Sequence, residues 1–275
     1  MNKLLKIAIS ASIVAGKEIL KIYNTDFDVE YKADESPLTM ADKNANDVIM
    51  SFLVDTGIPV LSEEGRSITY EERKDWNELW IVDPLDGTKE FVKKNDEFTV
   101  NIALIRNNKP VMGVVYAPVL DELYFGDEVE GAYKLNDASH KIDNLNQVIS
   151  LATKLSSNNT KSYFGIVASR SHLTQETTNY IDEISKGKEN VEIVSKGSSL
   201  KIVMIAEGIA DVYPRFAPTS EWDTAAGHAV VLASGGRIVQ AASQNDEVVY
   251  NKDDILNPWF IVVGAELLSS GFGEH

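Results

Sequence analysis

The sequence has no cysteine among its 275 residues, which excludes disulfide bonds and any reaction that needs a thiolate. It also has few cations, because 26 Lys and Arg stand against 42 Asp and Glu, a formal net charge of −16. A chain this acidic repels polyanions, so we expect no nucleic-acid partner. If such a chain binds a small anion, cations must bridge its carboxylates to that anion, which is a common task of Mg²⁺.

Long hydrophobic runs are lacking as well, since no stretch reaches the ~18 apolar residues of a membrane-spanning helix. Lys3, Lys6 and the apolar residues after them resemble a short signal peptide. However, these apolar residues recur at three- and four-residue steps, which predicts an amphipathic helix over residues 4–22. Together with the absence of cysteine, this favours a soluble, cytoplasmic protein. Peripheral contact with the inner membrane and the oligomeric state stay open.

The pattern of apolar residues divides the chain into two halves, residues 1–145 and 146–275, around a polar segment. The first half reads as helices at 4–22 and 41–57, then strands at 79–82, 98–105 and 111–117 with a turn at 107–110. The second half alternates strands near 165–168, 191–194, 211–215, 238 and 260 with helices near 175–185, 198–207 and 224–234. We therefore expect a mixed α/β (α+β) fold with two intimately packed halves.

Acidic residues at the end of the strand at 79–82 are the first candidate site. Asp83 and Asp86 stand three residues apart in the run Asp83-Pro84-Leu85-Asp86-Gly87-Thr88. Pro84 and Gly87 favour a turn there, and the irregular backbone of a turn leaves carbonyl groups free to coordinate a hard cation. Taken alone, the motif is equally typical of a tight turn with a local aspartate cap.

Two further acidic motifs are less specific when each is taken alone. Glu63 and Glu64 follow the apolar residues 58–61, but adjacent acids in an acidic chain are usually just solvated. Glu221-Trp222-Asp223 precedes a helix of small residues, where Asp223 also suits a helix N-cap.

Taken together, the three motifs resemble the signatures of the lithium-sensitive, metal-dependent phosphomonoesterase superfamily that contains inositol monophosphatase, fructose bisphosphatase and the bisphosphate nucleotidases. The likeness extends to the bacterial 3'(2'),5'-bisphosphate nucleotidases of the CysQ type. It covers residues 36–42, 61–64, 83–91, 169–172, 197–208 and 213–229. The resemblance implies a layered α/β/α/β sandwich of the inositol monophosphatase type. It also implies hydrolysis of adenosine 3',5'-bisphosphate, a by-product of sulfate assimilation, to AMP and phosphate.

The resemblance also implies two or three Mg²⁺ ions at the junction of the halves. Glu63, the Asp83 carboxylate and the Leu85 carbonyl would hold one ion, and Asp83, Asp86 and Asp223 the second. A bridging carboxylate such as Asp83 suits a two-metal reaction, because two close cations clamp the attacking and the leaving oxygen. Glu64 is the candidate for a third ion.

The same resemblance assigns catalytic roles to Asp42, Thr88 and Glu63. The Thr88 hydroxyl, hydrogen-bonded to Asp42, would orient and deprotonate the attacking water. A further group would contact the substrate, and it comprises Gly87, Thr88, Arg170, His172, Ser198, Ser199, Lys201 and Arg215. Among these, Arg215 has a planar guanidinium that suits a second phosphate group.

Two alternatives stay open at this stage. One is another phosphatase of the same superfamily, acting on an inositol or sugar phosphate. The more distant one is a metal-dependent nucleotide sensor without turnover, which the presence of both Asp42 and Thr88 disfavours.

Overall fold

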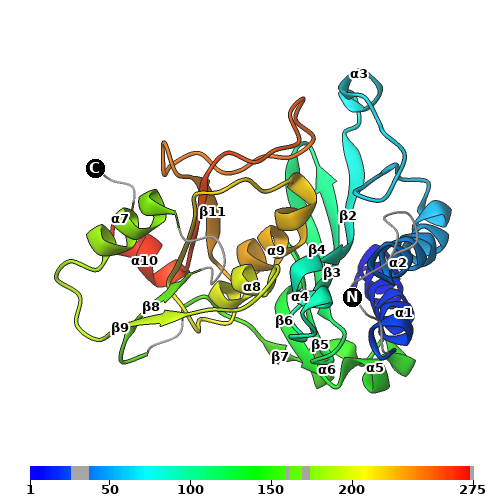
Figure 1. Ribbon diagram of the computed structural model, residues 1–275, viewed down its shortest axis with the longest axis horizontal. Coiled ribbons are helices and arrows are strands. Elements are labelled where there is room, and N and C mark those ends of the chain that lie inside the picture. The colour runs from blue at the N-terminus through cyan, green and yellow to red at the C-terminus, as the bar shows by residue number, and fades with distance from the viewer. Residues whose placement is uncertain (26–36, 159–160, 169–173, 273–275) are drawn as a thin grey trace.

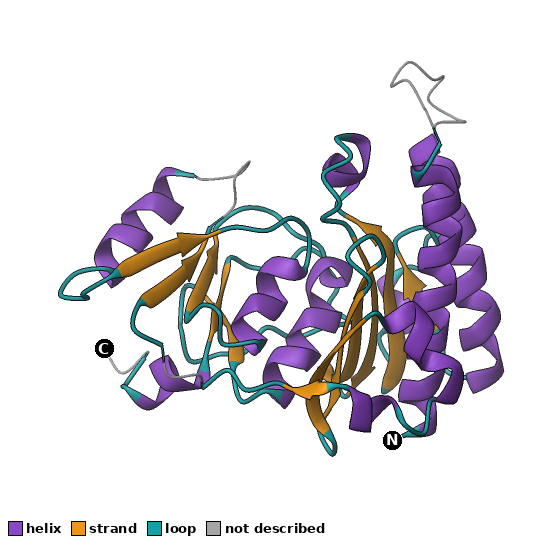
Figure 2. Cartoon of the chain, turned by 90° about the horizontal axis from the view of Figure 1, so that it is seen from below, coloured by secondary structure: helices purple, strands orange, loops and turns teal. Residues whose placement is uncertain are grey.

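A computed structural model describes residues 1–25, 37–158, 161–168 and 174–272, arranged in alternating layers of helix and sheet (Figure 1). Helices α1 (Lys3–Tyr23) and α2 (Pro37–Leu53) cover one face of a seven-stranded sheet. Helices α8 (Leu200–Ala206) and α9 (Glu221–Ala233) lie between that sheet and a five-stranded sheet, as Figure 2 shows from a second direction. The expected α/β/α/β layering is confirmed.

The first sheet has the strand order β1-β2-β3-β4-β5-β6-β7 and is antiparallel except for the β1–β2 pair. Its strands are β1 (Val60–Ser62), β2 (Glu78–Asp86), β3 (Thr99–Arg106), β4 (Lys109–Ala117), β5 (Glu122–Asp127), β6 (Gly131–Asn136) and β7 (Thr153–Lys154). The three strands expected from the sequence are present as β2, β3 and β4. The predicted hairpin turn is present too, with Asn107 and Asn108 both at positive φ (49° and 64°).

The second sheet has the order β11-β12-β10-β8-β9 and mixes parallel with antiparallel pairs. Its strands are β8 (Phe164–Val167), β9 (Val191–Val194), β10 (Val212–Arg215), β11 (Arg237–Gln240) and β12 (Phe260–Val263). On its outer side lie α7 (Gln175–Ile184) and α10 (Ala265–Ser269). The alternation expected for this half is confirmed.

Short helical elements complete the described chain. They are the 3₁₀ turns η1 (Val54–Thr56) and η2 (Ile142–Asn144) and the helices α3 (Tyr70–Arg73), α4 (Thr88–Val92), α5 (Ala138–Lys141) and α6 (Val148–Leu151). Within the described ranges, no helix is both long and apolar enough to cross a bilayer. The division of the chain at residues 145 and 146 stays a prediction, and β7 of the first sheet follows that point.

Helix α9 is buried on both sides, because it packs against both sheets. Its small residues permit a very close approach to β4: a Cβ added at Gly113 would lie 2.2 Å from the Ala226 carbonyl oxygen. Such a contact requires glycine at that position of the strand. The close fit fixes the start of α9, and with it Asp223, beside the end of β2.

His228 lies in the middle of α9 with no exposed surface, and its Nδ1 is 2.9 Å from the Tyr250 hydroxyl. Burial, with a smaller effect of the Arg237 cation, lowers its pKa from 6.5 to about 3. The unfolded chain therefore binds a proton at a pH where the folded chain does not. The stability that the neutral ring supports is present above the unfolded pKa and is lost as the pH falls through it.

We expect the free energy of unfolding to fall as the pH drops from 7.5 to 5, by about 2 kcal/mol through His228 alone. His228→Gln lacks this pH-dependent contribution. The difference in free energy of unfolding between wild type and variant should therefore shrink by about 2 kcal/mol from pH 7.5 to pH 5. Urea unfolding of both proteins in metal-free buffer at the two pH values measures it. A difference that does not change with pH would contradict the assignment.

Candidate active site

An acidic cluster forms where β2 meets the start of α9. Asp83 follows the apolar part of β2, and the pairing with β3 shifts between Asp83 and Asp86, which turns Asp86 out of the regular strand. Asp223 is the third residue of α9 and approaches from the other half of the chain. Asp83, Asp86 and Asp223 each offer a carboxylate oxygen, and these oxygens lie within 4.8 Å of one another. The family resemblance of the sequence implied this meeting of the three residues.

Burial and mutual repulsion dominate the electrostatics of this cluster. Asp83 is 1% exposed, and burial raises its pKa well above 3.8, with further contributions from Asp86 and Glu63. Burial and the Asp86 charge likewise raise the pKa of Asp223 to about 7. The ionised cluster is therefore costly without a compensating cation.

Glu63 joins the cluster because β1 runs parallel to β2. Its backbone N–H donates to the Val82 carbonyl at 3.2 Å, beside Asp83. The Glu63 side chain is exposed at the rim, yet neighbouring protein atoms displace part of its hydration. This raises its pKa, while hydrogen bonds with Asp83 and Trp222 act in the opposite direction. Glu64 lies on the exposed turn that follows.

Asp42 lies on α2 and Thr88 begins α4, on the side of the cluster that faces the N-terminal helices. Asp42 is 7% exposed, and burial, then the charges of Glu64 and Glu63, raises its pKa to about 8. Among the described residues, no hydrogen bond joins the Asp42 carboxylate to the Thr88 hydroxyl. The catalytic roles of this pair stay predictions.

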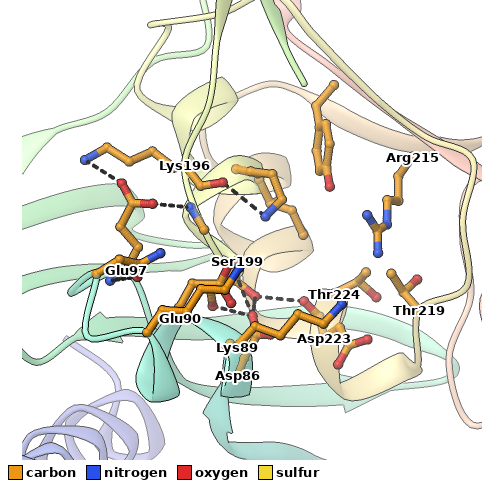
Figure 3. A pocket seen from close by; sticks show the side chains of 18 of the residues that line it. Asp86, Lys89, Glu90, Glu97, Lys196, Ser199, Arg215, Thr219, Asp223 and Thr224 are labelled. Carbon is orange, nitrogen blue, oxygen red and sulfur yellow. Dashed lines mark hydrogen bonds and ion pairs between the residues drawn. The ribbon is translucent and has the colours of Figure 1, made fainter. Parts of the chain in front are cut away.

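A pocket of about 320 Å³ opens beside Asp86 and Asp223. Arg215 reaches into it from β10 toward Asp223 (Figure 3). Its Nη2 lies 3.4 Å from the Pro218 carbonyl, and its buried Nε has no hydrogen-bond partner within the described part of the chain. Lys201 lines the same pocket, and burial lowers its pKa. An anionic ligand would satisfy both cations.

The remaining predicted substrate residues are placed differently. Gly87 lines the pocket at φ 98°, a left-handed conformation that suits glycine. Ser198 and Ser199 also line it, but their hydroxyl groups lie against the Asp86 carboxylate. Arg170 and His172 fall outside the described residues.

Three residues of the site were not predicted from the sequence. Thr99 and Asn101 are buried polar residues at alternate positions of β3, and they bond to Ser198 and Ser199 respectively. Their alternation within an apolar strand was the available signal, because such residues share one face of a sheet. Tyr213, two residues before Arg215 on β10, also lines the pocket.

The cluster gives a stability prediction for Asp83→Asn. Without divalent cations the variant should melt a few °C above the wild type, because a buried like charge is gone and roughly 1 kcal/mol moves Tm by ~2–4 °C. With excess Mg²⁺ the order should reverse, since the wild type alone retains the central ligand. Thermal unfolding in EDTA and in MgCl₂ measures this, with the exposed Asp47→Asn as control. The same order under both conditions would exclude a cation site around Asp83.

Known proteins resemble this chain over most of its length. Residues 1–265 match the sequence profile described as the inositol monophosphatase family. The chain is 43% identical to the 3'(2'),5'-bisphosphate nucleotidase CysQ of Salmonella typhimurium, over 90% of this chain and 94% of that protein. It is 34% identical to the protein of the same name from Haemophilus influenzae, over 97% and 93%.

Solved structures agree with the fold described above. The crystal structure of CysQ from Bacteroides thetaiotaomicron is 52% identical and superposes with a TM-score of 0.89, covering 94% of this chain and 96% of that one. Staphylococcal IMPase-II is 22% identical, with a TM-score of 0.73 over 98% and 92% of the two chains, and shows likeness of fold alone.

Proposed function

Since the chain belongs to the inositol monophosphatase family, as its match over residues 1–265 shows, we propose that it is a 3'(2'),5'-bisphosphate nucleotidase. It hydrolyses adenosine 3',5'-bisphosphate to AMP and phosphate. One observation carries this choice of substrate: Lys201 and Arg215 line the pocket beside the acidic cluster. A substrate with two phosphate groups places one at the cluster and the other against these cations, whereas an inositol monophosphate would leave them without an anion.

The donor set fits hard divalent cations. Asp83, Asp86 and Asp223 each offer a carboxylate oxygen, the kind of ligand that Mg²⁺ prefers, and Asp83 is buried. Glu63, Asp83 and the Leu85 carbonyl would hold one Mg²⁺. Asp83, Asp86 and Asp223 would hold a second, and Glu64 would steer a third. When bound, such cations offset the charge on the phosphoryl and leaving oxygens and make water easier to deprotonate.

Asp42 and Thr88 move the proton of the attacking water. Burial, then the charges of Glu64 and Glu63, raises the pKa of Asp42 to about 8. Cations bound at these two glutamates would lower that pKa, so Asp42 would be ionised at neutral pH and able to accept a proton. The Thr88 hydroxyl can then accept a proton from water and pass its own to Asp42. Thr88 stands at the start of α4, where the backbone N–H groups after Gly87 would favour a phosphate.

Other aspects of the proposal rest on the sequence alone. They are the cytoplasmic location, peripheral contact with the inner membrane and the absence of a nucleic-acid partner. A phosphatase for inositol or sugar phosphates is the second candidate, and the two cations in the pocket argue against a monophosphate of either kind.

Phosphate release tests the activity. With Mg²⁺, adenosine 3',5'-bisphosphate should have a higher kcat/KM than inositol 1-phosphate or fructose 1,6-bisphosphate, and EDTA should abolish turnover. Asp83→Asn should lose at least about 10³-fold in kcat/KM, because both cations lose a ligand. Lithium at tens of millimolar should inhibit, as in the superfamily. Preference for inositol 1-phosphate, or a folded Asp83→Asn variant with normal turnover, would reject the proposal.

Arg215→Ala tests the contact with the second phosphate. Losing a charge-assisted hydrogen bond of about 1.5–3 kcal/mol should lower kcat/KM for adenosine 3',5'-bisphosphate roughly ten- to a hundredfold. Hydrolysis of 3'-AMP, which lacks the 5'-phosphate, should hardly change. Arg106→Ala, at an exposed arginine paired with Glu78, is the control. Equal losses on both substrates would give Arg215 a different role, and Lys201 would then be the candidate for that contact.

A further inference from the structure

The Asp86 carboxylate is held through one of its two oxygens. Oδ2 accepts from the Ser198 hydroxyl at 2.5 Å, the Ser199 backbone N–H at 2.7 Å, the Ser199 hydroxyl at 2.7 Å and the Asn101 amide at 3.4 Å. Within the described part of the chain, no hydrogen bond ends on Oδ1. A carboxylate whose one oxygen is held by several donors cannot rotate freely, so Oδ1 is the oxygen left available to a cation.

Most of these donors come from the serine loop, residues 196–199 between β9 and α8. The loop is pressed against the other half of the chain at a second point, where the Gly197 N–H donates to Glu97 Oε2 at 2.9 Å (Figure 3). A Cβ at Gly197 would lie 2.6 Å from Glu90 Cγ and 2.7 Å from the Glu97 carbonyl. Ser198 adopts φ 51°, so the loop is held in a conformation that side chains rarely adopt.

Ser199 connects two of the acidic residues of the cluster. Its hydroxyl lies 2.8 Å from the Asp223 carbonyl oxygen as well as 2.7 Å from Asp86 Oδ2, and it accepts from the Asn101 amide at 2.9 Å. Ser199 is 2% exposed. Its single proton is therefore already shared between groups of the protein, which leaves little for a substrate.

We propose that the serine loop, through Ser198 and Ser199, positions Asp86 and Asp223 and so sets the affinity of the second cation site. This inference rests on the metal assignment of the proposed function. It changes the role expected from the sequence, where both serines contact the substrate. Hydrogen bonds to ligating carboxylates typically alter metal affinity by about 10- to 100-fold, because they fix the orientation of the ligand.

Ser199→Ala tests this role by a measurement that needs no turnover. We expect the Mg²⁺ concentration at the midpoint of thermal stabilisation to rise about 10- to 100-fold relative to the wild type. Ser199→Thr, which keeps the hydroxyl, should restore much of the affinity. The matched control is Ser157→Ala: Ser157 is also buried, but its hydroxyl bonds the Ser234 carbonyl and the Ala265 N–H, away from the pocket.

Ser198→Gly is a second variant that folding should tolerate, because the positive φ at this position suits glycine. It removes the 2.5 Å hydrogen bond to Asp86 and should also raise the Mg²⁺ midpoint. For both variants, excess Mg²⁺ should largely restore kcat/KM, since the defect lies in cation binding.

The outcomes separate this inference from the proposed function. A wild type that Mg²⁺ neither stabilises nor activates would reject the proposed function itself. A wild type that responds to Mg²⁺, together with Ser199→Ala and Ser198→Gly midpoints equal to it, would overturn the inference alone. The inference would also be overturned if the variants had unchanged Mg²⁺ midpoints but a raised KM for adenosine 3',5'-bisphosphate at saturating Mg²⁺. That result would instead support direct contact between the serines and the substrate.

Discussion

Repulsion between the buried carboxylate of Asp83 and the half-buried carboxylates of Asp86 and Asp223 is the constraint around which the site is organised. Asp83 has 1% of its surface exposed, and the carboxylates of Asp86 and Asp223 lie within 4.8 Å of it. Such an arrangement persists only if packing elsewhere holds it. The close contact between α9 and Gly113 provides part of that packing. Glu221, fully buried two residues before Asp223, adds to it by accepting from the Asn251 and Lys252 N–H groups at 2.7 and 3.0 Å.

The charge distribution of the pocket follows from the same constraint. A chain with a net charge of −16 repels anions over most of its surface, yet Lys196, Lys201 and Arg215 line one cavity. The charge of Lys201 lies next to the acidic cluster without neutralising it, because its ammonium donates to the Lys196 carbonyl and, within the described ranges, to no carboxylate. Opposite charges side by side suit a ligand that brings phosphates to both.

The sequence predicts the acidic cluster through its resemblance to a known family, because each acidic motif taken alone is equally or more typical of a turn, a solvated surface or a helix cap. It does not predict strands β5, β6 and β7, and it does not predict the hydrogen-bond partners of Asp86. The segment around β7 is polar, and its strand pairing depends on β6 and not on local propensity. Thr99 and Ser198 are 99 residues apart, so their contact follows from the packing of the two sheets and cannot be read from spacing.

The position of α9 has a consequence for the modularity of the chain. Although it belongs to the second half by sequence, its residues Ala226 and Val230 share a hydrophobic core with Ile81 and Val115 of the first sheet. A fragment ending before residue 160 would leave that face of the sheet open to water and would lack Asp223. We therefore expect that neither half folds independently. Circular permutations that separate α9 from the first sheet would disrupt both the hydrophobic core and the acidic cluster.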